Sequence, residues 1–274
     1  MIDIHSHILF GVDDGAAALK DSLALARVYV TAGYRYVVAT PHAEVDSLPS
    51  ESYARTVRSQ VYCLNHSLQE QGIELVVLPG MEVGLDPLLL AMVVQEKILT
   101  LAGTRYLLVE TPFEQLPLNW WEVVFKLAAS GIVVIFAHPE RCAQVADDQE
   151  LLDKMAQAGA KFQVNWDSFA GAYGRRVVKV ARSMARKGFI HCLATDSHDP
   201  NVRNAGNVRE IGMRLKGLIG ENNLRRIAVE NPARVIQGER LLDMDQADMP
   251  ECVKEKKAAR RFGFWSMLKS VSGG

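Results

Sequence analysis

Short, continuous apolar runs recur along the chain at intervals of about 30 residues. Each run holds consecutive apolar side chains instead of alternating them with polar ones, which is typical of parallel strands covered on both faces. The seven runs are residues 2–4, 36–39, 75–78, 106–109, 132–137, 162–164 and 190–194. This pattern predicts a parallel sheet with seven strand positions.

Longer amphipathic stretches separate these runs and predict helices. They cover residues 19–32, 52–71, 87–97, 120–130, 150–158 and 177–187. Five of the six are followed by a glycine, the residue that most often ends a helix. Two more helical patterns, 208–218 and 224–229, are predicted to complete the domain and to end at Asn231-Pro232. Regular alternation of strand and helix predicts an α/β fold with parallel strands and right-handed crossovers.

The composition changes near residue 243. Residues 254–261 are strongly basic, and apolar side chains follow them up to about residue 271. We therefore predict a folded domain over residues 1–242 and a basic, apolar C-terminal tail over residues 243–274. A solvated tail is the simpler interpretation of this segment. The alternative is weak contact with an anionic membrane through residues 254–271.

Composition narrows the class of protein. The chain has 274 residues, of which 49% are hydrophobic and 23% charged, and its net charge is −1. This near-neutral balance gives no reason to expect a nucleic-acid partner. Four cysteines without paired spacing, no signal-like N-terminus and no apolar run of about 20 residues predict a cytoplasmic protein. Peripheral contact with the inner face of the membrane is kept as an alternative.

Histidines and carboxylates collect at the carboxyl ends of the predicted strands. They are His5, His7 and Asp14 after the first run, His42 after the second, Glu82 after the third, Glu110 at the end of the fourth, His138 after the fifth, and Asp196 and His198 after the seventh. A hydrogen-bonded loop residue explains one such position, but not a group after six of seven strands. In a barrel these ends converge on one face, where active sites form, so we expect a closed or distorted (β/α)7 barrel.

Imidazole and carboxylate side chains together indicate a metal centre. Without thiolates the set suits Mn, Fe, Zn or Ni and is unlike a structural zinc site. Nine ligands are more than one ion can bind, and they suit two or three ions. Enzymes that transfer phosphoryl groups to water commonly use such a group of ions. His66 and His191 lack a strand-end position, and we expect neither to bind metal.

Two arginines are candidates for binding a substrate phosphate. Arg141 follows His138 in the segment HPER, and Arg203 follows the segment DSH. The guanidinium group binds phosphate oxygens in a bidentate way, although an ordinary surface ion pair is the alternative for both residues. No arginine stands six residues after any cysteine, so the phosphate loop of a thiolate phosphatase is absent. Attack by a metal-activated water is therefore the expected chemistry.

Six segments together resemble a known family. DIHSHILFGVDDGA, VVATPH, GMEV, LLVETP, AHPER and ATDSH resemble the PHP (polymerase and histidinol phosphatase) superfamily, and more closely its CpsB/CapC branch of bacterial capsule and exopolysaccharide tyrosine phosphatases. The resemblance runs from residue 1 to about residue 241. It implies a distorted barrel of the PHP type.

The resemblance also implies a centre of three metal ions, usually Mn²⁺, with Fe, Zn, Co and Mg as alternatives. By the family pattern, His5, His7, Glu82 and Asp196 hold the first ion; Glu82, Glu110 and His138 hold the second; and Asp14, His42 and His198 hold the third. Arg141 and Arg203 match the phosphate-binding arginines.

The activity that the resemblance implies is protein-tyrosine phosphatase. The expected substrate is the phosphotyrosine tail of a bacterial tyrosine kinase that controls polysaccharide export. Two alternatives remain: a small-molecule phosphatase of the histidinol-phosphatase type, and a metal-binding module without catalysis. The segments GVDDGA and HPER argue against the first, and the full ligand set argues against the second.

Overall fold

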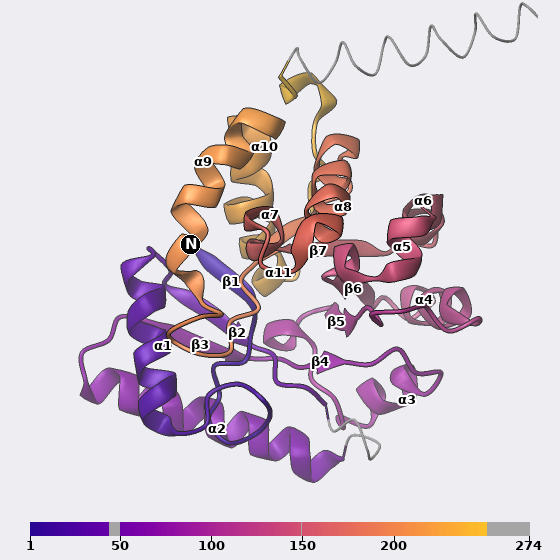
Figure 1. Cartoon of the computed structure of the whole chain (residues 1–274). Coiled ribbons are helices and arrows are strands. Elements are labelled where there is room, and N and C mark those ends of the chain that lie inside the picture. The colour runs from indigo at the N-terminus through magenta and orange to yellow at the C-terminus, as the bar shows by residue number, and fades with distance from the viewer. Residues whose placement is uncertain (44–49, 149, 251–274) are drawn as a thin grey trace, which may run out of the picture.

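The computed structural model describes residues 1–43, 50–148 and 150–250. Residues 254–271, for which weak membrane contact is the alternative to a solvated tail, lie outside the described residues. Helices surround two groups of parallel strands, with β1, β2 and β3 on one side of the molecule and β4 to β8 on the other (Figure 1).

The strands are short and all their pairings within these sheets are parallel. They are β1 (Ile2–Ser6), β2 (Tyr36–Ala39), β3 (Val76–Pro79), β4 (Glu82–Val83), β5 (Tyr106–Glu110), β6 (Val133–Ala137), β7 (Lys161–Asn165) and β8 (Cys192–Ala194). The first sheet has the order β1-β2-β3 and the second the order β4-β5-β6-β7-β8. The α/β class with parallel strands is therefore confirmed.

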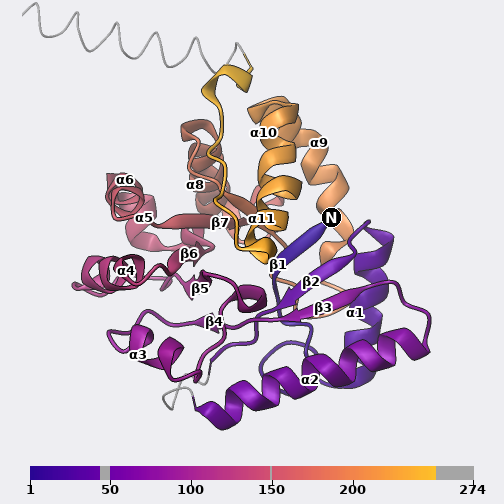
Figure 2. The same ribbon diagram turned by 180° about the vertical axis from the view of Figure 1, so that it is seen from behind.

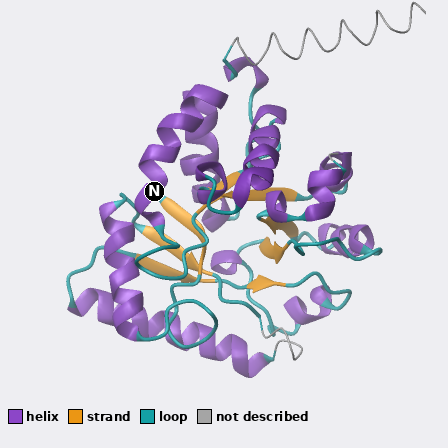
Figure 3. Cartoon of the chain, viewed as in Figure 1, coloured by secondary structure: helices purple, strands orange, loops and turns teal. Residues whose placement is uncertain are grey.

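Helices connect successive strands and cover the outer faces of both sheets (Figures 2 and 3). The α-helices are α1 (Leu19–Thr31), α2 (Glu51–Glu70), α3 (Leu89–Val94), α4 (Trp120–Ala129), α5 (Ala143–Asp147), α6 (Glu150–Gln157), α7 (Asp167–Ala170), α8 (Gly174–Lys187), α9 (Val208–Ile219), α10 (Glu221–Arg225) and α11 (Asn231–Gln237). Single turns of 3₁₀-helix cover Leu101–Gly103, Pro139–Arg141, Ala205–Asn207 and Gln246–Asp248.

The third strand position is broken between β3 and β4. The first part pairs with β2 and the second part pairs with β5, so one strand position serves both sheets. The break falls at Gly80, where a Cβ atom would lie 2.8 Å from Cγ1 of Val38. Because only glycine fits so close to β2, the chain can leave one sheet here and join the other.

The other edges of the two sheets meet at a single point. Ser6 of β1 forms an isolated bridge with Ser197, which lies beyond the end of β8, and no ladder joins the two strands within the described ranges. A closed ring of hydrogen-bonded strands is thus not found in this part of the chain, and the (β/α)7 barrel is not confirmed.

One apolar core nevertheless belongs to both sheets. Ile4 of β1, Val38 of β2, Leu108 of β5 and Ile135 of β6 are fully buried in the same cluster. Their neighbours Leu107 and Phe136 point the other way, into a larger cluster formed with the surrounding helices. The strands are therefore covered on both faces, as their continuous apolar runs predict.

The C-terminal region extends past the predicted end at Asn231-Pro232, so that prediction is wrong. A π-helical turn, Arg226–Glu230, runs directly into α11, which begins at Asn231. Proline is tolerated in the first turn of a helix because the amide hydrogen that it lacks has no partner there. Of the helices that the structure describes, none has the length and apolar character needed to cross a membrane.

Candidate metal centre

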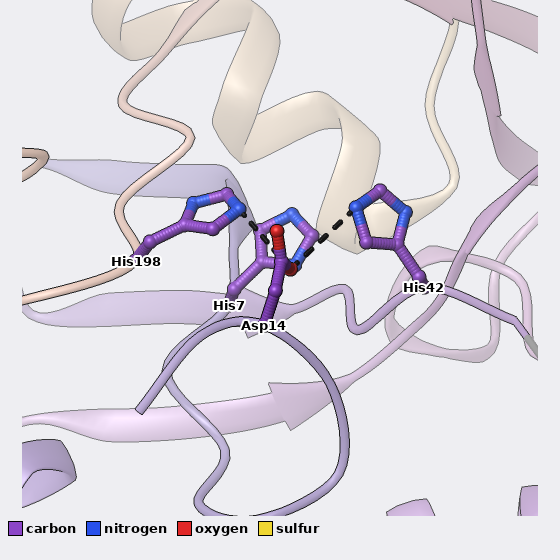
Figure 4. A group of neighbouring side chains, drawn as sticks. All are labelled: His7, Asp14, His42 and His198. Carbon is purple, nitrogen blue, oxygen red and sulfur yellow. Dashed lines mark ion pairs between the residues drawn. The ribbon is translucent and has the colours of Figure 1, made fainter. Parts of the chain in front are cut away.

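Strand ends and the loops after them bring the predicted ligands together. Three overlapping groups have ligand atoms within 4.8 Å of one another: His5, His7 and Asp196; His5, Glu82 and His138; and His7, Asp14, His42 and His198. The last group is drawn in Figure 4, where the Asp14 carboxylate lies between the rings of His42 and His198. Eight of the nine predicted ligands therefore converge on one place.

Glu82 lies at the centre of this arrangement. Its Oε1 atom is 3.0 Å from Nε2 of His138, and its Oε2 atom is 3.2 Å from Nε2 of His5 and 3.3 Å from Nδ1 of His42. The side chain is 1% exposed, and Oε2 forms no hydrogen bond. A buried carboxylate oxygen among imidazole nitrogens is the arrangement that a ligand of divalent cations would have.

Hydrogen bonds fix which nitrogen of His5 faces the centre. The carboxylate of Asp196 accepts from Nδ2 of Asn165, the Asn165 amide oxygen accepts from Gln163, and the Gln163 amide oxygen faces Nδ1 of His5 at 2.9 Å. Because a carboxylate only accepts, the order of donors along this chain is determined. His5 Nδ1 therefore carries a proton, and Nε2 is the nitrogen that faces the centre.

His7 is oriented by Asp13. Nδ1 of His7 lies 2.7 Å from Oδ2 of Asp13, and the backbone amides of Gly15 and His42 donate to the same carboxylate. His7 Nε2 also faces inward, 3.2 Å from Nε2 of His5. Once deprotonated, two imidazole nitrogens this close offer a pair of donor atoms to a common cation, so the donor set fits divalent metal ions.

Asp196 divides its two oxygen atoms between different partners. Oδ1 lies 3.5 Å from nitrogen atoms of both His5 and His7, whereas Oδ2 lies 2.6 Å from Arg203 and 3.3 Å from Arg141. One oxygen thus faces the predicted ligands and the other holds both predicted phosphate-binding arginines at the edge of the centre. Its backbone is left-handed with φ +53°, a strained conformation often found at functional sites.

Two aromatic rings enclose Arg141. Its guanidinium carbon lies 4.6 Å from the ring centre of Phe113 and 4.4 Å from that of Tyr173. Such contacts restrict the side chain to one orientation and add a cation–π attraction. Phe113 follows β5 and Tyr173 precedes α8, so residues far apart in sequence jointly position this arginine.

The buried charges of the centre compensate one another. Burial alone would raise the pKa of Glu82 and Asp196, but the surrounding histidines hold both pKa values well below their usual range. Burial disfavours protonated His7, yet Asp13 and Glu82 raise its pKa to about 10. Burial and the nearby His7 lower the pKa of His198 to about 4. Ionised carboxylates in a buried site need positive charge, which bound metal ions provide.

Three residues considered in the sequence analysis lie outside the three ligand groups. Glu110 ends β5 as expected, but it lies outside the three groups, with Oε2 4.0 Å from Nδ1 of His42. His66 is exposed beside Glu70, and His191 is buried beside Lys161 and Asp243. Neither histidine lies in a ligand group within the described chain.

Two of the cysteines that the structure describes, Cys142 and Cys192, are unsuited to nucleophilic catalysis. Burial raises the pKa of the Cys142 and Cys192 thiols, which keeps both protonated. Cys63 is exposed on α2, and Cys252 lies outside the described residues. This agrees with the missing cysteine–arginine spacing in the sequence.

Several residues of the site were not predicted from the sequence. They include Asp13, the neighbour of the predicted ligand Asp14, and Gln163 and Asn165 of β7. Polar residues at alternate positions of a buried strand are a usable signal, since each needs a hydrogen-bonding partner. Phe113 and Tyr173 carried no such signal.

Comparison with known proteins gives a consistent result. The family model for capsular polysaccharide synthesis, CpsB/CapC, matches residues 1–237. The tyrosine-protein phosphatase YwqE of Bacillus subtilis is 34% identical over 204 residues, which is 74% of this chain and 80% of that protein. The tyrosine-protein phosphatase CpsB of Streptococcus pneumoniae is 26% identical over 247 residues, which is 86% of this chain and 98% of that protein.

A solved structure also matches closely. It comes from work on YwqE of Bacillus subtilis and CpsB of Streptococcus pneumoniae, described as unique metal-dependent tyrosine phosphatases. The match has a TM-score of 0.84 and 29% sequence identity, and it covers 91% of this chain and 99% of the other.

Proposed function

The chain belongs to the CpsB/CapC capsular polysaccharide synthesis family, and on this basis we propose that it is a metal-dependent protein-tyrosine phosphatase. The observation that carries the proposal is the buried Glu82 carboxylate, whose oxygens lie within 3.4 Å of nitrogen atoms from four histidines. Such a donor set suits a group of divalent cations and has no simpler structural purpose.

We assign three metal positions, with Mn²⁺ as the preferred ion because four of the nine ligands are carboxylates. Iron, zinc, cobalt and magnesium are the alternatives. The first position is held by His5, His7, Glu82 and Asp196; the second by Glu82, Glu110 and His138; and the third by Asp14, His42 and His198. When bound, the ions activate water and offset the negative charge of the phosphate.

The arginines bind and orient the phosphate in this account. Asp196 Oδ2 holds Arg203 at 2.6 Å, and Phe113 and Tyr173 hold Arg141 from both sides. Positioned guanidinium groups bind phosphate oxygens by charge-assisted hydrogen bonds, which contribute roughly 1.5–3 kcal/mol each. The phenol of tyrosine has a pKa of about 10, so its departure needs little help from a general acid.

The centre is open on one side, which supports a protein substrate. The Asp14 side chain is 63% exposed, whereas Glu82 and Asp196 on the inner side are at most 2% exposed. A phosphotyrosine on a protein segment can approach from the Asp14 side. The substrate that we propose is the phosphotyrosine tail of a bacterial tyrosine kinase linked to capsule or exopolysaccharide synthesis.

Three further assignments belong to the proposal. The protein acts in the cytoplasm, with peripheral membrane contact through residues 254–271 as a separate hypothesis. The two sheets form an open version of the distorted (β/α)7 barrel of the PHP type. The catalytic domain includes at least residues 1–242.

The deciding experiment compares substrates. Purified protein loaded with Mn²⁺ is assayed for phosphate release from a phosphotyrosine peptide, a phosphoserine peptide and histidinol phosphate. We expect kcat/KM for the phosphotyrosine peptide to exceed that for the other two by at least tenfold. A preference for histidinol phosphate would favour a small-molecule phosphatase, and no turnover of any substrate would favour a non-catalytic metal-binding module.

A further inference from the structure

Helix α8 carries an unusual surface charge. Its sequence, GRRVVKVARSMARK, contains six basic residues and no acidic one, although the whole chain has a net charge of −1. Four of them, Arg175, Lys179, Arg182 and Arg186, are spaced by four, three and four residues and therefore lie along one exposed stripe. We call this stripe the α8 basic face.

The charges of this face are not neutralised within the described part of the chain. None of its four residues forms an ion pair there, whereas Arg55 of α2 pairs with Glu51 and Arg214 of α9 pairs with Glu210. Like charges four residues apart destabilise a helix. The α8 basic face therefore lowers the stability of the folded protein. A binding function would explain why these charges are present.

The N-terminal end of α8 lies beside the metal centre. Tyr173 is the N-cap of α8, and its ring packs on Arg141, which Asp196 holds at 3.3 Å. A cavity of about 380 Å³ lies here, lined by Phe113, Arg141, Tyr173 and Arg176 among others. From α8 the cavity is lined by Arg176 and Val177, and the α8 basic face starts at the adjacent Arg175.

A second cavity adjoins the other end of the face. It has a volume of about 340 Å³, and its lining combines Arg182 and Arg186 with Phe169 and Leu218. Apolar surface bordered by guanidinium groups suits an aromatic ring that carries a negative charge. Arg175 and Arg186 are 11 positions apart, which corresponds to about 16 Å along the helix and to about five residues of extended peptide.

We propose that the α8 basic face binds an acidic, multiply phosphorylated segment of the protein substrate while one phosphotyrosine of that segment occupies the metal centre. This inference rests on the proposed function and adds to it a second contact surface for the substrate, outside the metal centre. The complementary charges give the enzyme preference for clustered phosphotyrosines over isolated ones.

The test uses two four-residue variants that remove equal charge. In the first, Arg175, Lys179, Arg182 and Arg186 are all replaced by glutamine. The matched control replaces four exposed basic residues on other elements by glutamine: Lys20, Arg105, Lys126 and Arg240. The substrates are para-nitrophenyl phosphate, a peptide with one phosphotyrosine in neutral flanks, and a peptide with three phosphotyrosines and acidic flanks.

We expect the α8 variant to raise KM for the triply phosphorylated peptide about tenfold, since exposed ion pairs each contribute modestly. Its kcat for that peptide, its turnover of para-nitrophenyl phosphate and its metal content should equal those of the wild type. The control variant should change none of these. In the wild type, raising NaCl from 50 to 500 mM should raise KM for the triply phosphorylated peptide far more than for the neutral one.

Three results would overturn the inference. Equal KM values for the α8 and control variants would remove the docking role. Loss of binding to vesicles of equal phosphatidylcholine and phosphatidylglycerol, with unchanged peptide KM, would make α8 a membrane-contact face instead. If wild-type enzyme hydrolyses para-nitrophenyl phosphate but no phosphotyrosine peptide, the proposed function itself fails and the docking role with it.

Discussion

Asp13 and Asp14 are sequence neighbours with different roles. Asp14 is largely exposed and lies within 3.4–3.8 Å of three histidines, as a direct ligand would. Asp13 instead accepts from His7 Nδ1 and from two backbone amides, which orients the imidazole from behind. Carboxylates in that position fix the tautomer and the basicity of a metal-binding histidine.

The first prediction concerns this orienting role. Asp13→Asn should weaken metal binding by roughly ten- to a hundredfold, because an amide no longer stabilises the same form of His7. Metal content after dialysis against graded Mn²⁺ concentrations measures the effect. Asp153→Asn, at an exposed position on α6, serves as the control and should leave metal affinity unchanged. Wild-type affinity in the Asp13 variant would contradict the assigned role.

The second prediction concerns the contact of Tyr173 with Arg141. The Tyr173 hydroxyl lies near Asn165 but is buried without a hydrogen bond of ordinary geometry to a described residue. Tyr173→Phe keeps the ring and should change kcat/KM less than twofold. Tyr173→Leu removes the cation–π contact, worth roughly 0.5–2 kcal/mol, and should lower kcat/KM by about 3- to 30-fold.

Metal content separates this positioning role from a structural one, since both Tyr173 variants should bind metal normally. The loss in Tyr173→Leu should appear for every phosphorylated substrate, because Arg141 is proposed to bind the phosphate itself. If the phenylalanine variant were as damaged as the leucine variant, the hydroxyl and not the ring would be the important group.

The sequence predicts those candidate ligands that stand at the end of a strand. His5, His42, His138 and Asp196 stand at strand ends, and parallel strands bring their ends to one edge. Gln163 and Asn165 could not be found in this way, because their role depends on which neighbouring strand lies beside β7. The pairing of β7 with β8 is a property of the folded molecule.

At the scale of elements, the loop after β1 is shaped by one glycine. A Cβ atom on Gly15 would lie 2.1 Å from the carbonyl oxygen of His7 and 2.6 Å from its Cβ. The loop therefore packs directly on the backbone of a predicted ligand, and this contact brings Asp13 and Asp14 to the histidines.

The third prediction follows from this contact. Gly15→Ala should force the loop away from His7, which lowers both metal content and the melting temperature, since overpacking costs about 1–3 kcal/mol. Gly217→Ala is the matched control, because its Cβ would meet nothing within 4 Å and it lies within a helix. The control should be neutral or slightly stabilising. Unchanged metal content in Gly15→Ala would show that the loop tolerates displacement.

Element positions were largely predictable, whereas breaks within elements were not. Each of the seven apolar runs became a strand position, since burial on both faces requires such runs. The break at Gly80 was not predicted, because a glycine after a strand is equally typical of a simple turn. The continuation of the helix through Pro232 was not predicted either, since proline both starts and ends helices.

At the scale of the whole molecule, the residues after 242 pack against the domain. Asp243 lies 3.1 Å from Nζ of Lys161, and Met249 is 2% exposed. The fully buried Asn223 exchanges two hydrogen bonds with the backbone of Asp245. These contacts favour a domain boundary after Met249 over the predicted one at 242.

The fourth prediction compares two truncations. A protein ending at Pro250 should keep wild-type stability and turnover of para-nitrophenyl phosphate. A protein ending at Leu242 removes two hydrogen bonds of the buried Asn223 amide, which costs about 1–3 kcal/mol and should lower the melting temperature by roughly 5 °C. Equal melting temperatures would support the boundary at 242. Loss of turnover in the longer truncation would show that residues beyond 250 contribute to the site.

The central claim is that the converging histidines and carboxylates hold the metal ions on which catalysis depends. Its most direct test is a titration of metal-free protein with Mn²⁺, in which bound metal and phosphate release from a phosphotyrosine peptide are measured on the same samples. We predict no turnover without metal, a rise in turnover with bound metal up to about three ions per chain, and fewer bound ions with no turnover in Glu82→Gln. Full turnover by protein shown to contain no metal would contradict the account.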